Sequence, residues 1–328
     1  MFVTGLFGGV LASAQSPVPE PGALLQNGDI AVSVGRAQVF VFSPTGELKK
    51  ILKTGSGGQY TAGSSIQPDG GLLVTGFDQS ALYQFDRSGR LLGRLGSGWA
   101  APESVIPSAD QHYLVGQVES NDISGSGDTR APKLSLIRPD GTAVQHFRPR
   151  FDRGIDWIDL ATDGRTLMYT SESLIIGRYD LALDAQLPDF AALDRSGVIA
   201  YALRLLPDGG VMVATGRSSG TTDNYVARFD AQGRMRVRYQ PDNGREFFPE
   251  GLFALNLDGD GQSFWTAGLP DGPLYRIDLE SGKLLALISS LAPSLGVGGE
   301  YVTGISVRGE LLVGASGAVA CPQLQSRS

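Results

Sequence analysis

Cysteine and histidine are nearly absent from this chain. Its 328 residues include one cysteine, Cys321, and two histidines, His112 and His146. An intrachain disulfide needs two cysteines, and a structural zinc site usually needs four Cys or His ligands. Both are therefore excluded, although a single cysteine does not decide the redox compartment.

Basic charge and long hydrophobic runs are also scarce. Lys and Arg number 27 against 34 Asp and Glu, a formal net charge of −7. Nucleic acids and anionic membrane surfaces attract clustered positive charge, so neither is an expected partner. No apolar run approaches the roughly 20 residues of a membrane-spanning helix, and we expect no transmembrane segment.

Helical periodicity is missing as well, whereas glycine is abundant. The chain has 45 glycines, about twice the usual share of roughly 7%. Strand-like alternation of apolar and polar residues occurs instead, for example in Ala81–Phe85 and Val226–Phe229. Many tight turns between short strands indicate an all-β fold.

A repeat unit of four strands recurs along the chain. Clear copies start at Ser64, Ala202 and Phe253, and in each an Asp-Gly-like turn follows the first strand. Successive turns lie 41 to 53 residues apart, which is typical of β-propeller blades. Seven turns predict a single propeller of seven four-stranded blades, with six full blades plus a partial one as the alternative. The turns fall at Gly28, Gly70, Gln111, Gly164, Gly209, Gly261 and Gly309.

The two ends of the chain differ from the repeats. Residues 1–15 are uncharged and largely apolar, with Ala12-Ser13-Ala14 resembling a signal-peptidase site. They are therefore either an export signal or a strand that closes the last blade. The propeller is expected over residues 16–318, followed by a C-terminal tail over residues 319–328.

The two faces of the predicted propeller differ in their loops. Turns between strands one and two, or three and four, are uniformly tight. Long segments such as Val118–Lys133 and Arg217–Asn224 join strands two and three on the opposite face. Functional residues concentrate on irregular loops carried by a rigid scaffold. We therefore expect the site on this long-loop face, at the mouth of the central channel.

Counting back from each turn gives the residues at which the inner strands enter that mouth. Acidic and aromatic side chains are prominent among these residues and their neighbours. The residues expected to bind a ligand there are Glu103, Asp156, Trp157, Tyr201, Glu250 and Phe253. Three acids, Glu20, Glu103 and Asp156, supply the oxygen ligands that Ca²⁺ or Mg²⁺ prefers. A solvated acidic rim without any metal is the alternative.

The repeat resembles the NHL type of propeller. The stretches Gly154–Glu172, Tyr201–Gly216 and Phe253–Gly268 are similar to a group of bacterial secreted NHL-like proteins. That resemblance covers roughly Asp29 to Val313 and implies export, to the periplasm or the exterior, together with a binding or structural role. It supplies no catalytic residue.

Gluconolactonase/regucalcin-like propellers are a more distant match in architecture. Their resemblance implies a divalent metal held by Glu, Asp and two Asn, whereas the ring here contains no Asn. The sequence therefore favours a non-enzymatic scaffold that binds a protein or an extracellular glycan. A metal-dependent lactonase-like hydrolase is the alternative.

Deletion of the N-terminal segment tests whether it is a closing strand or an export signal. If a strand within Met1–Val18 completes the last blade, deletion of Met1–Gln15 exposes a sheet edge. The melting temperature should then fall and the protein should associate, as calorimetry and size-exclusion chromatography would show. An equally stable, monomeric deletion variant would identify the segment as an export signal.

Overall fold

Short strands and tight turns make up the chain. The computed structural model describes residues 22–55, 57–58, 60–118, 132–194, 198–217, 224–240, 248, 251–268, 273–288 and 302–309. The turn after the strand Thr61–Ile66 shows why the sequence folds this way. Gly70 adopts a φ of 86°, which favours glycine, and its N–H donates to Gln67 O at 2.9 Å. The Asp69 carboxylate accepts a further bond from Gly71 N, so the turn satisfies its own polar groups.

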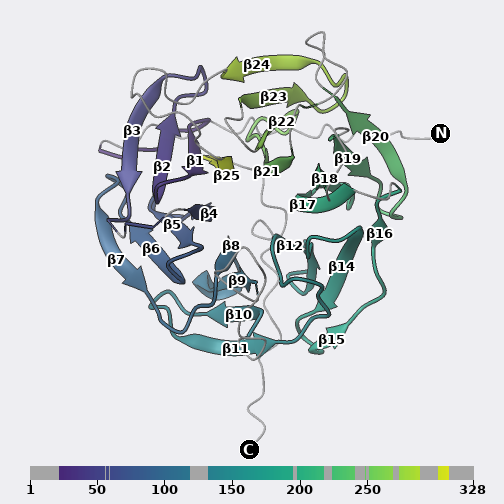
Figure 1. The fold of residues 1–328 in the computed structure, drawn as a ribbon, viewed down its shortest axis with the longest axis horizontal. Coiled ribbons are helices and arrows are strands. Elements are labelled where there is room, and N and C mark those ends of the chain that lie inside the picture. The colour runs from purple at the N-terminus through teal and green to yellow at the C-terminus, as the bar shows by residue number, and fades with distance from the viewer. Residues whose placement is uncertain are drawn as a thin grey trace, which may run out of the picture.

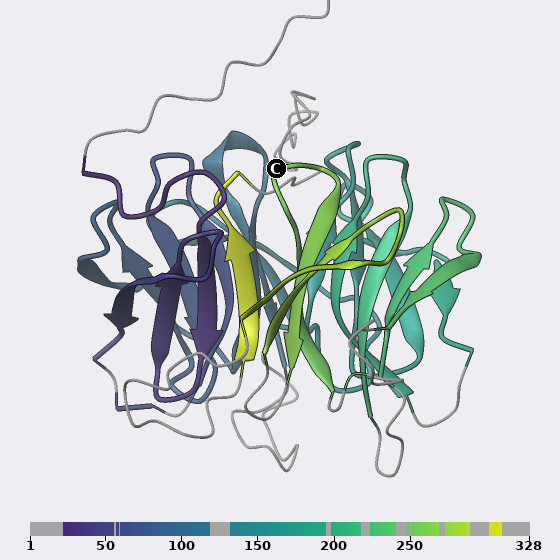
Figure 2. The ribbon, with the colours of Figure 1, turned by 90° about the horizontal axis from the view of Figure 1, so that it is seen from above.

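The strands form six antiparallel sheets arranged radially around a central axis (Figure 1). Seen from the side, the sheets stand next to one another like the blades of a propeller (Figure 2). The all-β, single-propeller prediction is therefore confirmed. The six inner strands are β4 (Thr61–Ile66), β8 (Pro102–Pro107), β12 (Ile158–Leu160), β17 (Val198–Leu205), β21 (Leu252–Leu257) and β25 (Val302–Val307).

Three further strands complete each blade outward. The second strands are β5 (Leu72–Gly76), β9 (Tyr113–Gln117), β13 (Thr166–Tyr169), β18 (Val211–Arg217), β22 (Ser263–Gly268) and β1 (Ile30–Val34). The third are β6 (Ala81–Phe85), β10 (Leu134–Ile137), β14 (Ile175–Asp180), β19 (Val226–Phe229), β23 (Leu274–Asp278) and β2 (Gln38–Phe42). The outermost are β7 (Leu91–Leu95), β11 (Ala143–Phe147), β15 (Ala185–Gln186), β20 (Met235–Tyr239), β24 (Leu284–Ile288) and β3 (Leu48–Lys53).

Two small elements supplement the blades. The strand β16 (Ala191–Ala192) pairs with β14, and a short 3₁₀ helix spans Ala109–Gln111. Within the part of the chain that the structure describes, no helix has the length and hydropathy needed to span a bilayer.

The closing blade joins the two ends of the folded chain. Its order is β25-β1-β2-β3, and β25 pairs with β1 in antiparallel register from Ile30↔Val307 onward. Beyond the last pair, Gly28 N donates to Arg308 O and Arg308 N donates to Asp29 O, each at 2.8 Å. The inner strand of this blade therefore comes from late in the chain and the outer three come from its start.

This closure corrects the predicted number of blades. The glycines Gly28 and Gly309 both adopt φ near 85° and lie at the same end of the same sheet. They are the two halves of one interrupted turn, so counting both of them as turns counts the closing blade twice. Seven blades is therefore wrong, and the six full blades of the alternative are present.

The strands that close the ring also differ from the expected ones. All three outer strands of the closing blade lie between Ile30 and Lys53. The expected donor, a strand within Met1–Val18, lies outside the described residues.

Side-chain hydrogen bonds connect the inner strands around the channel. Arg204 Nε on β17 donates to Asn256 Oδ1 on β21 at 3.0 Å, and Asn256 Nδ2 donates to Ile305 O on β25 at 2.9 Å. Ser306 and Ser64 hydroxyls then join β25 to β4 at 2.9 Å. These bonds connect the closing blade to both of its neighbours.

Hydrophobic layers fill the spaces between neighbouring blades. One layer combines Phe40 and Ile305 of the closing blade with Trp265 and Ala267 of the β21–β24 blade. Trp265 is fully buried there, and its Nε1 donates to Asp258 Oδ2 at 2.9 Å. Because this layer is built from two blades, loss of the pairing between β25 and β1 would weaken the packing of the closing blade and of the β21–β24 blade.

Ile305 tests how strongly the fold depends on that seam. It is 2% exposed in the layer that seals the closing blade. Ile305→Ala should lower the free energy of unfolding by about 2–5 kcal/mol, since it leaves a cavity. Urea denaturation would measure the change. Leu285→Ala on the outer strand β24, where the side chain is 52% exposed, should cost no more than about 0.5 kcal/mol. An equal loss in the free energy of unfolding for the two variants would contradict the role assigned to Ile305 in the layer that seals the closing blade.

Candidate functional site

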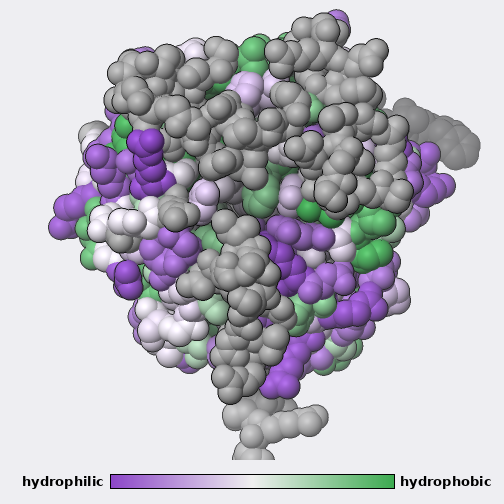
Figure 3. Space-filling view, viewed as in Figure 1, coloured by the Kyte–Doolittle hydropathy of each residue, from purple (hydrophilic) through white to green (hydrophobic). Residues whose placement is uncertain are grey.

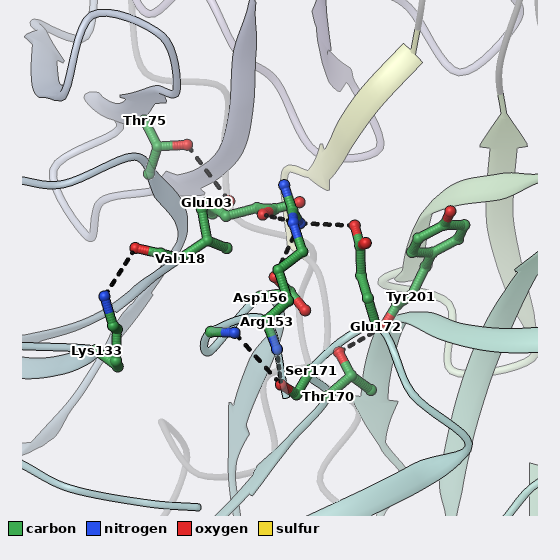
Figure 4. Close-up of polar contacts among 11 residues, drawn as sticks. Thr75, Glu103, Val118, Lys133, Arg153, Asp156, Thr170, Ser171, Glu172 and Tyr201 are labelled. Carbon is green, nitrogen blue, oxygen red and sulfur yellow. Dashed lines mark hydrogen bonds and ion pairs between the residues drawn. The ribbon is translucent and has the colours of Figure 1, made fainter. Parts of the chain in front are cut away.

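The entrances of the inner strands bring several of the predicted residues together at the channel mouth. Glu103 lies on β8, Asp156 lies two residues before the start of β12, and Tyr201 lies on β17. Phe253, on β21, packs against Tyr201 with ring centroids 4.2 Å apart. The site therefore spans consecutive blades, as expected of a channel mouth (Figure 4).

A hairpin adds a further acid to this site. The strands β12 and β13 pair about the Gly164 turn, and the pairing extends to Asp156 N, which donates to Thr170 O at 3.1 Å. Glu172 follows two residues later, with a φ of 48° in the left-handed region. The hairpin register therefore places Glu172 beside Asp156 although 16 positions separate them.

Arg153 connects the three acids. Its Nη1 lies 3.2 Å from Glu103 Oε2, 3.1 Å from Asp156 Oδ1 and 2.6 Å from Glu172 Oε1. The Ser171 hydroxyl accepts from the backbone N–H of Arg153 at 3.2 Å and so holds the loop. The Arg153 guanidinium also lies over the Phe77 ring, 5.6 Å from its centroid. We call Glu103, Arg153, Asp156 and Glu172 the mouth cluster.

The members of the mouth cluster differ in depth. The side chains of Asp156 and Glu103 are 0% and 3% exposed, whereas those of Glu172 and Arg153 are 22% and 28% exposed. A ligand that comes from solvent therefore meets Glu172 and Arg153 first.

Burial and mutual repulsion raise the pKa values of Asp156 and Glu172, the two acids that the hairpin places side by side. Burial raises the pKa of Asp156 well above its usual range, and the Glu103 charge adds to this effect while Arg153 opposes it. Burial, with Glu103 next, raises the pKa of Glu172 from 4.5 to about 7 against the pull of Arg153. The mouth cluster therefore holds protons under conditions in which exposed carboxyls have lost theirs.

The pKa values of Arg153 and Tyr201 respond to the same charges. Burial alone would lower the pKa of Arg153, but Glu103, Asp156 and Glu172 outweigh it and the pKa rises. Burial and then the Glu172 charge raise the pKa of Tyr201. Arg153 therefore remains a cation and Tyr201 a neutral phenol at physiological pH.

The remaining predicted residues lie elsewhere. Trp157 is 2% exposed and packs in the hydrophobic core, because consecutive residues entering a strand point to opposite sides. Its position in the core argues against the predicted ligand contact. Glu20 and Glu250 lie outside the described residues.

Sequence reasoning missed Arg153 and Glu172. Glu172 could have been found from the hairpin, since pairing about Asp163-Gly164 places residues 155 and 172 opposite each other. No comparable signal marks Arg153, which is one of several arginines in the segment from Arg148 to Arg153.

The mouth cluster does not fit a resident divalent cation. Carboxylate oxygens of Glu103, Asp156 and Glu172 lie within 4.8 Å of one another, a spacing that such an ion could use. However, the Arg153 Nη1 contacts all three, so a positive charge already occupies the position among them. A metal ion would have to displace this guanidinium.

Comparison of the sequence with protein-family models and with curated proteins gives no match. The six-bladed propeller is thus what the chain shows, and the resemblance to NHL-type and gluconolactonase-like propellers stays a prediction.

The shifted acids predict a pH-dependent stability. Asp156 and Glu172 bind protons more tightly in the native state than in the unfolded chain. The free energy of unfolding should therefore fall as the pH rises from about 4.5 through about 7. Glu172→Gln removes one of the two groups and should reduce this loss, measured as the change in melting temperature between about pH 5 and about pH 8.

The matched control is Glu280→Gln, which alters a side chain that is 96% exposed. That variant should keep the wild-type pH dependence. A Glu172→Gln variant with the wild-type dependence would contradict the proton binding assigned to the mouth cluster.

Proposed function

We propose that this chain is an exported binding protein that holds a protein segment or an extracellular glycan at the channel mouth. The mouth cluster is the observation that carries the proposal. It combines buried carboxyls and an arginine with a partly exposed edge, next to the packed, mutually tilted rings of Tyr201 and Phe253. Planar polar groups beside aromatic rings supply orientation and contact area in binding sites.

The opposite face offers less for recognition. Its turns satisfy their own polar groups, as in the bond from Gly209 N to Leu206 O at 2.9 Å.

The surface drawn in Figure 3 is the end of the propeller that faces the viewer in Figure 1. Hydrophilic and hydrophobic residues are intermixed across its described part. Recognition by a large apolar patch, which usually marks an obligate interface, is not supported by the described part of this surface. A polar ligand at the mouth agrees better with it.

Export is the part of the proposal that rests on sequence. Residues 1–15 have the apolar, uncharged composition of a signal sequence and end near an A-x-A triplet. The resemblance to secreted NHL-like propellers points in the same direction.

A divalent-metal-dependent, lactonase-like hydrolase is the second candidate. The three converging carboxylates favour it, and the central guanidinium of Arg153 opposes it. Turnover of a lactone panel that requires Mg²⁺ or Ca²⁺ and disappears in Glu103→Gln would support this candidate over the binding protein.

Binding screens test the proposed function directly. Glycan arrays and a displayed peptide library would be screened with the wild-type protein, and each hit titrated against variants. Glu172→Gln and Tyr201→Leu should weaken binding at least tenfold, because both remove contacts at the mouth. Glu280→Gln, on a tight turn between β23 and β24, should leave affinity unchanged within about twofold. Hits that depend on Glu280 but not on the mouth residues would refute the location.

A further inference from the structure

The mouth cluster has more carboxyl groups than cations. One oxygen from each of Glu103, Asp156 and Glu172 contacts the same nitrogen, Arg153 Nη1. A single guanidinium cannot neutralise three ionised carboxylates, and buried charge without a counterion is costly. Asp156 and Glu172 therefore keep protons, which a second positive group would replace.

One buried carboxylate oxygen has no partner. The Asp156 side chain is wholly inaccessible, and its Oδ2 makes no hydrogen bond with any described residue. In Figure 4 this oxygen points away from the Arg153 contact, toward the side on which Glu172 lies. Buried carboxyl oxygens are normally satisfied, so a hydrogen-bond partner is missing at this point.

Aromatic rings border the same space. Tyr201 stands beside Glu172 in Figure 4 and packs on Phe253, while Phe77 lies beneath the Arg153 guanidinium. Aromatic faces attract organic cations. Arg153 itself thus demonstrates the chemistry that the mouth accepts: a planar cation that carboxylates hold against a ring.

The geometry points to a guanidinium or ammonium group as the ligand of this site, held at the accessible Glu172 carboxyl beside Tyr201 and attracted by the buried, unpartnered oxygen of Asp156 behind it. This inference rests on the proposed function, because it names the chemical class bound at the same mouth. An arginine or lysine side chain of a peptide, the amine of an amino sugar and a free polyamine share this chemistry.

An organic cation suits the mouth better than a metal ion does. Calcium needs six to eight oxygen ligands at about 2.3–2.6 Å, whereas the three acids are already held at 2.6 to 3.2 Å from Arg153 Nη1. A second organic cation can share these carboxylates without displacing Arg153, since each carboxylate accepts several hydrogen bonds.

Proton release would accompany such binding. Asp156 and Glu172 hold protons because burial disfavours their charged forms and Glu103 repels them, while Arg153 compensates only in part. A bound cation favours their ionised forms, so protons leave and affinity rises with pH. An anion that binds to Arg153 would have the opposite effect, which makes the sign of the proton exchange diagnostic.

Calorimetry with matched probes tests the inference. The full chain would be titrated near neutral pH, in two buffers of different ionisation enthalpy, with acetyl-Gly-Arg-Gly-amide, agmatine and a glucosamine oligomer. The neutral counterparts are the citrulline peptide and the N-acetylglucosamine oligomer. At least one cation should bind, with protons released, and at least tenfold tighter than its neutral counterpart where it has one. Which of the three binds identifies the source of the cation.

Variants locate the effect. Glu172→Gln should weaken cation binding at least tenfold and remove most of the proton release, and Tyr201→Leu should weaken binding without removing the release. Glu280→Gln should behave as wild type. Circular dichroism would verify folding, and Tyr201→Leu serves alone if Glu172→Gln does not fold.

Several outcomes would overturn the inference. These are equal binding of neutral probes, proton uptake, no binding of any cation, and binding of Mg²⁺ or Ca²⁺ alone that Glu172→Gln abolishes. If cations fail but array hits still depend on Glu172 and Tyr201, the proposed function stands without this inference. If the hits also ignore these residues, both fail.

Discussion

The antiparallel pairing of β25 with β1 closes the ring of six blades. Each hydrophobic layer of this propeller lies between two blades, so a ring left open at one seam would expose two apolar faces and unpaired strand edges. The register from Ile30↔Val307 to Val34↔Val302 closes that seam between segments far apart in the chain. We expect such a contact to form late in folding, because the loop that it closes is nearly the whole chain.

Ring closure also determines the geometry of the mouth. The inner strands are connected by bonds such as Arg204 to Asn256 and Ser306 to Ser64, which keep their entrances at a fixed separation. Glu103, Asp156 and Tyr201 belong to three consecutive blades and share no hairpin. Their proximity therefore depends on the packing of neighbouring blades, which the closed ring holds in place.

The spacing of turns along the sequence determines how much of the fold and of the site could be predicted. Turn-to-turn distances were sufficient for the all-β class, the four-stranded blades and the placement of Glu103, Asp156, Tyr201 and Phe253 near one channel end. They could not reveal that Gly28 and Gly309 belong to one turn, because this requires the pairing of distant strands. The contribution of Arg153 depends on the same kind of long-range approach. Trp157 packs in the core because successive side chains point to opposite sides of a strand, and its ligand contact stays a prediction.

The closing seam has a mechanical consequence. Residues Gly28 and Arg308 are hydrogen-bonded neighbours at the same end of the β25–β1 pair. Tension that separates them would act perpendicular to the strands and load the hydrogen bonds one after another, starting at Ile30 and Val307. The bonds would open as a zipper instead of resisting together in shear. A pull applied at this corner would thus open the ring at a smaller force than a pull that loads the same bonds together in shear.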